Sequence, residues 1–259
     1  MKKTLNKIIV IYIISLTLII LSPVAMTICG SFGITLTEIT IDMSGYVDFW
    51  IWKPLYFNAF LRSLFIAILT TVGNLIISVP ASYFFAKISF PGKTSLFMLY
   101  IILMVMPFQV TLLPQYIAAK SLHIYDTLFS LILPGIFATF SVFLITQNMK
   151  TMSDDIIEAA SLDTSNPLKI IYYVIIPSVR PGIICSAILV FSEMWSQVAE
   201  PLVMIESENK YPLAVLLNSN ITFNLYELAT IVIFLLPPIL LFLIFNDDVL
   251  EGMSKYNLK

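Results

Sequence analysis

Six long runs of apolar residues follow one another along the chain of 259 residues, and the shorter segments between them carry most of the charge. Each run approaches the roughly 20 residues that a helix needs to cross the hydrocarbon core of a membrane. The pattern predicts spans at about 8–28, 60–81, 96–118, 128–147, 182–204 and 226–246. We therefore expect an all-α, polytopic membrane protein with six membrane-spanning helices in a single domain over residues 1–259.

The composition agrees with a membrane protein. Hydrophobic residues make up 59% of the chain, charged residues only 12%, and the mean hydropathy is +0.94. The net charge of −2 gives no reason to expect a nucleic-acid partner. The single histidine, His123, and the absence of a CxxC or HExxH pattern predict neither a metal site nor redox chemistry. The first apolar run is longer than the core of about 7–15 residues of a secretory signal, so we expect it to remain as the first span.

Lysine and arginine are distributed unevenly between the two sides that six spans define. Only Lys53, Arg62, Lys120 and Lys210 fall on one side, and the other ten of the 14 fall on the opposite side. Positively charged loops favour the cytoplasm. Both termini and the loop at about 148–180 are therefore predicted to be cytoplasmic.

This loop contains a charged segment between the fourth and fifth predicted spans. Asp155 and Glu158 have the spacing of a capping box, which predicts the start of a short helix through Ala159 and Ala160. A second helix is predicted to begin with Asn166 as N-cap and Pro167 at its first position, and to stop near Pro177. Such a helix-turn-helix is too polar for lipid, and Ile156, Ile157 and Leu162 offer apolar contact area to a soluble partner.

The residues Glu158, Ala159, Ala160, Asp163 and Pro177 resemble the EAA loop of binding-protein-dependent ABC importers, with the consensus E-A-A-x-x-D-G followed by a proline. Thr164 stands where the family normally has glycine. The resemblance implies a type I ABC importer permease fold and a coupling helix that docks in a cleft on an ATPase subunit. The interface residues that it implies are Asp155, Glu158, Ala159, Ala160, Leu162, Asp163, Thr164 and Pro177. The alternative is an ordinary cytoplasmic connector.

The fifth predicted span carries ionisable residues at membrane depth. On a continuous helix Glu193, Gln197 and Glu200 would share one face, and such residues normally face a cavity or a partner. We interpret them, with Trp195 and Ser196, as candidates for the substrate pathway. The alternative is that they hydrogen-bond to a second membrane subunit.

Prolines within the predicted spans would kink or weaken the helices. They are Pro80, Pro107, Pro114, Pro134, Pro201, Pro237 and Pro238. The pair Pro134 and Gly135 is the candidate for a gate hinge.

The fifth span also resembles carbohydrate-uptake ABC permeases of the maltose and glycerol-phosphate type. Phe191, Trp195, Pro201 and Leu202 fit a pattern of an aromatic residue, Trp-Asn and Pro-Leu, with Ser196 in place of the asparagine. Further similarity lies at Leu113 to Tyr116, Leu131 to Gly135, Gln147, Pro237-Pro238 and Glu251-Gly252-Met253. The resemblance implies half of a pathway for a sugar or oligosaccharide across a bacterial cell membrane. Ser196 and the two glutamates leave a charged or amino-bearing solute open.

The resemblance also implies partners: an ABC ATPase dimer, a second homologous permease that forms a heterodimer with this chain, and an extracellular solute-binding protein. The sequence has no GxxxxGK[ST] loop, so we expect no catalytic residue and no cofactor here, with ATP and Mg²⁺ bound by the ATPase chains. An importer permease for peptides, amino acids or polyamines is the main alternative. A secondary transporter is a weaker one, because no inverted repeat is visible.

Overall fold

The computed structural model describes residues 2–34, 41–219 and 224–254, including the side chains of 9–34, 41–219 and 224–250. These residues form helices joined by short loops, with no β-strand among them. The chain divides into a smaller unit (Met1–Asn58 with Leu217–Leu236) and a larger unit (Ala59–Leu216 with Pro237–Lys259). Lys255 and Lys259, which contribute to the predicted orientation, lie outside the described residues.

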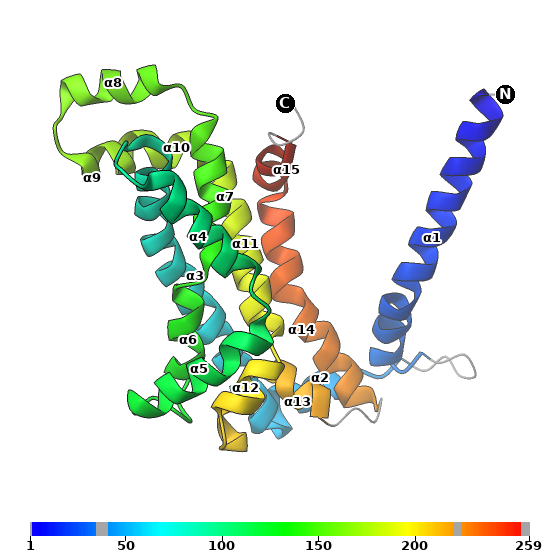
Figure 1. The fold of residues 1–259 in the computed structure, drawn as a ribbon. Helices are drawn as coiled ribbons and strands as arrows, with labels where there is room; N and C mark the ends of the chain where they lie inside the picture. The colour runs from blue at the N-terminus through cyan, green and yellow to red at the C-terminus, as the bar shows by residue number, and fades with distance from the viewer. Residues whose placement is uncertain (1, 35–40, 220–223, 255–259) are drawn as a thin grey trace. The chain divides into compact units, whose positions relative to one another are not determined.

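The helices are labelled in Figure 1. They are α1 (Lys2–Ser31), α2 (Ser44–Val47), α3 (Pro54–Lys87), α4 (Lys93–Val105), α5 (Phe108–Ser121), α6 (Phe129–Ile136), α7 (Thr139–Lys150), α8 (Asp154–Asp163), α9 (Pro167–Ile170), α10 (Ile176–Ser178), α11 (Arg180–Ser196), α12 (Ala199–Met204), α13 (Leu213–Ser219), α14 (Leu225–Ile244) and α15 (Asn246–Ser254). Two π-helical segments, Asp48–Trp52 and Ile171–Ile175, and a 3₁₀ turn, Glu208–Lys210, complete them.

Four helical segments are long and apolar enough to cross a membrane: Ile9–Ser31, Pro54–Lys87, Phe129–Lys150 and Leu225–Ile244. They confirm the first, second, fourth and sixth predicted spans. Two bent helix pairs raise the number to six if each pair is one span. Neither the third nor the fifth predicted span is a single helix, and a proline lies beside each interruption.

The third span is broken at Pro107. Helices α4 and α5 meet at an angle of 96°. Met106 has an extended backbone, with φ −61° and ψ 129°, because a residue before proline is driven out of the α-helical region by the proline ring. The predicted single span at 96–118 is therefore two helices.

The fifth span ends early. Helix α11 stops at Ser196, Gln197 is extended (φ −67°, ψ 130°), and the short helix α12 begins at Ala199. Pro201 explains the break, because a proline ring clashes with the carbonyl four residues earlier, which belongs to Gln197. At its other end, α11 follows the segment Pro167–Ser178 at an angle of 84°.

The core of the larger unit consists of two apolar clusters along α3. One joins Val79 of α3 to Ile145 and Met149 of α7 and to the buried side of residues 170–179. The other joins Ile66 of α3 to α5, α6 and the end of α12. Figure 1 shows α8 and α9 at one end of this unit and α5 and α12 at the other.

In the smaller unit, the end of α1 lies close to the start of α14. A Cβ atom at Gly30 would lie 2.8 Å from Leu228 Cδ1, so glycine permits this close crossing. Ser31 and Tyr46 share a hydrogen bond of 2.7 Å between their hydroxyl oxygens. These contacts fasten the end of α1 to α2.

Candidate functional site

A cavity of about 620 Å³ lies in the larger unit. Its wall includes residues from three places where a helix is interrupted: Met106 between α4 and α5, Ala138 between α6 and α7, and Gln197 between α11 and α12. Irregular backbone at membrane depth is tolerated only where protein or a water-filled cavity surrounds it. The cavity therefore surrounds the irregular backbone at the three helix breaks.

The polar residues predicted in the fifth span meet at this cavity, although they do not share one helix face. Glu193 lies on α11, Gln197 in the break, and Glu200 on α12. All three line the cavity together with Ser196. The expected stripe on a continuous helix is wrong because Pro201 ends the helix. The break itself brings the three side chains to one wall.

Within this wall, the side chains of Gln197 and Glu200 are bonded to each other. The Gln197 amide nitrogen donates a hydrogen bond to a Glu200 carboxylate oxygen. Glu200 is only 6% exposed, whereas Glu193 is open to the cavity. A buried carboxylate needs such a donor, since an unpaired buried charge is costly.

Trp195, the remaining fifth-span candidate, does not line the cavity. Its side chain is 1% exposed and is not among the residues that line the cavity. It packs between Phe60, with ring centroids 5.5 Å apart, and Phe191, at 5.7 Å. Its observed contacts are those of a core residue that supports the α11 end of the wall.

The candidate hinge residues Pro134 and Gly135 also line the cavity, on α6. A Cβ atom at Gly135 would lie 2.5 Å from Thr70 Cγ2 and 2.9 Å from Met194 Sδ. A side chain fits there only if the side chains of Thr70 and Met194 shift. The structure does not test motion at this pair, and the hinge role stays a prediction.

Asn74, on α3, was not recognised from the sequence as a site residue. It is fully buried, and its amide nitrogen donates to the carbonyls of Gly135 (3.3 Å), Ile136 (3.0 Å) and Ala138 (3.2 Å). Gly135 and Ile136 end α6 and Ala138 is the N-cap of α7, so the three carbonyls flank the break between the two helices. Asn74 thus stabilises the break between α6 and α7. An asparagine inside an apolar span was the available signal.

The predicted coupling unit forms at one end of the larger unit. Helix α8 begins at Asp154 with Ser153 as N-cap, whose hydroxyl oxygen accepts from the Asp155 backbone N–H at 3.3 Å. The prediction that Asp155 caps this helix is therefore wrong by two residues, because the serine hydroxyl takes that role. Asp154 instead accepts a hydrogen bond of 2.6 Å from Lys87 at the end of α3.

The turn after α8 has no need for glycine. Thr164 is extended, with φ −155° and ψ 136°, which a β-branched residue adopts readily. Asn166 caps the next helix as predicted, accepting from the Leu168 N–H at 3.0 Å. Helix α10 contains Pro177 and ends at Ser178, which confirms the predicted stop.

Helix α8 presents two different faces. Ile157 and Ala160 are partly buried against the apolar cluster that residues 170–179 share with α3 and α7. Contact of Ile157 with a partner stays a prediction. On the other side Leu162 is 90% exposed, next to the exposed Glu158 and Ala159. Asp155, Ile156 and Asp163 are exposed as well, and Pro177 is exposed on α10. The outer face therefore combines carboxylates with apolar area.

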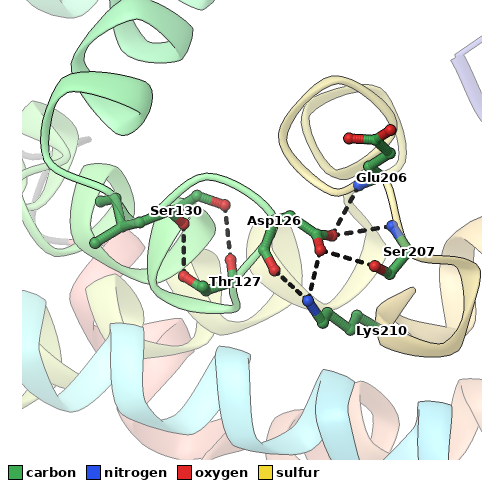
Figure 2. A network of polar contacts seen from close by, with 7 residues as sticks. Asp126, Thr127, Ser130, Glu206, Ser207 and Lys210 are labelled. Atoms are coloured by element: carbon green, nitrogen blue, oxygen red, sulfur yellow. Dashed lines mark hydrogen bonds and ion pairs between the residues drawn. The ribbon is translucent and has the colours of Figure 1, made fainter.

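A polar network ties the segment before α6 to the segment after α12 (Figure 2). Asp126 accepts hydrogen bonds from the backbone N–H groups of Glu206 (3.0 Å) and Ser207 (2.9 Å), and from the Ser207 hydroxyl (2.7 Å). The Lys210 ammonium donates to the Asp126 carboxylate at 2.5 Å and to its backbone carbonyl at 2.7 Å. Both segments lead to cavity-lining helices, so the network holds their ends together.

We expect Asp126→Asn to lower the midpoint temperature of unfolding at pH 7. The hydrogen bond from Lys210 and those from Ser207 hold the pKa of Asp126 below its ordinary value of 3.8. A carboxyl with a lowered folded-state pKa contributes stability above the unfolded-state pKa, and this contribution is lost as the pH falls through the folded-state value. The wild type should therefore have the higher midpoint temperature of unfolding at pH 7, and its difference from the variant should shrink below about pH 3.8.

Thermal unfolding of the detergent-solubilised protein between pH 7 and pH 3 checks this expectation. Asparagine tolerates the φ of +56° at this position, so the substitution adds no backbone strain. Glu206→Gln is the matched control, since it removes a neighbouring charge but leaves its backbone N–H bonded to Asp126. An equal effect of both substitutions, or a difference that persists at pH 3, would contradict the assigned role.

Comparison with known proteins identifies the chain. Residues 78–252 match the family described as binding-protein-dependent transport system inner membrane component. The chain belongs to this family. It is therefore an ABC transporter permease, a membrane-embedded transport subunit, and the resemblance seen in the sequence is confirmed.

Similar permeases include the arabinooligosaccharides transport system permease protein AraQ of Halalkalibacterium halodurans, with 27% identity over 228 residues, 86% of this chain and 82% of that protein. The sn-glycerol-3-phosphate transport system permease protein UgpE of Agrobacterium fabrum is 24% identical over 207 residues, 78% and 72% of the two chains. The fold matches a chain in the crystal structure of a bacterial ABC transporter involved in the import of the acidic polysaccharide alginate. The TM-score is 0.81 and the sequence identity 20%, and the match covers 95% of this permease and 96% of that chain.

Proposed function

We propose that this permease forms half of the solute pathway of an ATP-driven importer for sugars or oligosaccharides. The observation that carries the proposal is the cavity at the three helix breaks, whose wall combines apolar surface with Glu193, Gln197 and Glu200. Its volume suits a small solute. The names of similar permeases, for arabinooligosaccharides and glycerol 3-phosphate, support a saccharide or a polyol derivative.

In this proposal α8 is the coupling helix. Its exposed face, with Glu158, Ala159, Leu162 and Asp163, would enter a cleft on a partner ATPase that binds ATP and Mg²⁺. The opposite face packs on α9 and the π-helical segment Ile171–Ile175, whose buried residues share an apolar cluster with α3 and α7. Helix α7 continues to the break at Ala138, which lines the cavity. Movement of α8 therefore has a packed route to the pathway.

The complete importer would contain this permease, a second and different homologous permease, two ATPase subunits and an extracellular solute-binding protein. The termini and α8 would lie in the cytoplasm, as the distribution of lysine and arginine predicts. Alternating access would follow from closure of the ATPase subunits. A permease for polyamines or other cationic solutes is the second candidate, because two carboxylates line the cavity.

Affinity purification of the tagged permease from its native membrane in mild detergent, followed by mass spectrometry, tests the proposal. We expect an ATPase, a second permease and a solute-binding protein to be recovered together. Binding measurements on the recovered solute-binding protein then separate saccharides from polyamines. Recovery of the permease alone, with transport that does not depend on ATP, would contradict the proposal and favour a secondary transporter.

A further inference from the structure

The ionisable groups that line the cavity are all acidic, and most of its hydrogen-bonding groups are acceptors. Glu193 and Glu200 bring two carboxylates to its wall. Among the described residues that line it, no lysine, arginine or histidine is present to balance them. Charges at membrane depth interact strongly because the surroundings are poor in water. The wall therefore carries two acidic groups and no basic group that offsets them.

The two lining glutamines add acceptors to this wall. The amide oxygens of Gln115 and Gln197 are buried and accept no hydrogen bond from any described residue. The Gln197 amide nitrogen is already engaged by Glu200, which directs its oxygen away from that carboxylate. Buried polar atoms are normally paired, and an unpaired one calls for an explanation such as a missing ligand.

Two of the three hydroxyl groups that line the cavity donate within their own helices, and the third, on Thr139, stays available as a neutral donor. The Thr111 hydroxyl donates to the Phe108 carbonyl at 2.9 Å, and the Ser196 hydroxyl donates to the Ser192 carbonyl at 2.7 Å. Their protons are used within the helices, and only oxygen lone pairs are left for a solute. Neutral donors such as the Gln115 amide remain, but the cavity offers mainly acceptors.

We infer that the solute is an uncharged or amino-bearing saccharide, and that Glu193 and Glu200 exclude uronates and phosphate esters from the pathway. Sugar hydroxyls and ammonium groups supply the donors that these acceptors lack. A carboxylate or phosphate would bring a further negative charge and no donors to pair with them, which is rejection by repulsion. The inference rests on the proposed function, since it names the chemistry of the transported solute.

This assignment would set the permease apart from similar proteins. One relative is named for sn-glycerol 3-phosphate, and the transporter of similar fold imports the acidic polysaccharide alginate. Both of those solutes are anions. The acidic cavity therefore predicts that the solute of this permease, unlike theirs, is not an anion.

The test uses the purified importer complex in lipid nanodiscs without its solute-binding protein, so that the selectivity of the binding protein does not enter. Three probes share one sugar ring and differ in charge: D-glucosamine, D-glucose and D-glucuronate. Saturation-transfer NMR measures their binding. We expect glucuronate to bind about tenfold or more weakly than glucosamine, a difference of about 1.4 kcal/mol.

The paired substitution Glu193→Gln with Glu200→Gln should reduce this difference to about threefold or less, because the ring contacts remain while the charge is gone. Glu208→Gln is the matched control; this exposed residue does not line the cavity and should leave the discrimination unchanged. Thermal unfolding and recovery of the partner chains show whether the variant complex is intact. Each single substitution serves as a second measurement if the pair fails to assemble.

The outcomes separate the two proposals. An assembled complex that binds glucuronate as well as glucosamine, that keeps its discrimination without both carboxylates, or that binds none of the probes, overturns the solute assignment but not the importer. Failure to recover an ATPase overturns the importer. Loss of assembly in each single variant would assign the glutamates to contacts with a second membrane subunit, and would overturn the assignment as well.

Discussion

Replacing Glu158 with lysine is expected to reduce solute uptake by about tenfold or more while the membrane-spanning part remains folded. Glu158 is exposed on α8, and its side chain makes no hydrogen bond or ion pair to any residue that the structure describes. Lysine and glutamate have similar helix propensities, so α8 should persist. In the proposed importer the lost interaction is with the ATPase, and about 1.4 kcal/mol of binding free energy corresponds to a factor of ten.

Uptake of labelled solute into cells and co-purification of the ATPase measure this effect together. Glu158→Gln distinguishes loss of the charge from its reversal and should have the smaller effect. Glu208→Lys is the control, because it makes the same substitution at an exposed residue distant in sequence from α8. Normal uptake by the Glu158→Lys variant would remove α8 from the coupling mechanism.

Replacing Asn74 with leucine is expected to destabilise the protein by about 1–3 kcal/mol, the usual cost of leaving a buried polar group without its partner. Leucine has a similar size but cannot donate to the carbonyls of Gly135, Ile136 and Ala138. Those carbonyls flank the break between α6 and α7, and Gly135 and Ala138 line the cavity. Transport should fall as well, because the position of the break is no longer determined.

Denaturant or thermal unfolding in detergent, with uptake in cells, checks both parts. Ser82→Ala is the matched control on the same helix: its hydroxyl donates a single hydrogen bond, to the Val142 carbonyl at 3.0 Å, away from the break. Its cost should be the smaller of the two. Equal costs, or an Asn74→Leu variant that unfolds and transports like the wild type, would show that the break does not depend on this amide.

Much of this permease could be predicted where the signals are local. Spans follow from the length of apolar runs, and four of them match helices of the structure. The second helix of the coupling unit begins at Pro167 because Asn166 is a good N-cap with proline after it. The start of α8 was missed by two residues, since Ser153, Asp154 and Asp155 all can cap a helix and only the geometry distinguishes them.

The sequence predicted that three polar residues of the fifth span lie together, but it gave a shared helix face as the reason, and the helix is interrupted there. Glu193, Gln197 and Glu200 do meet at one wall, but through a break in the helix instead of a shared face. Ionisable residues at membrane depth were the reliable signal. Trp195 matched a family pattern and lies in the core, because an aromatic residue in such a span packs equally well against other helices.

The sequence by itself determined that this is a membrane protein built from apolar helices, where the charged segment between the fourth and fifth predicted spans lies, and the family to which it belongs. Apolar length, capping residues and short motifs act locally and can be read along the chain. Only the tertiary structure decided where the helices break. Pro80, Pro237 and Pro238 stay inside continuous helices, whereas breaks occur beside Pro107 and before Pro201. Whether a proline ends a helix depends on which neighbouring groups satisfy the freed backbone atoms, and those neighbours are brought there by packing alone.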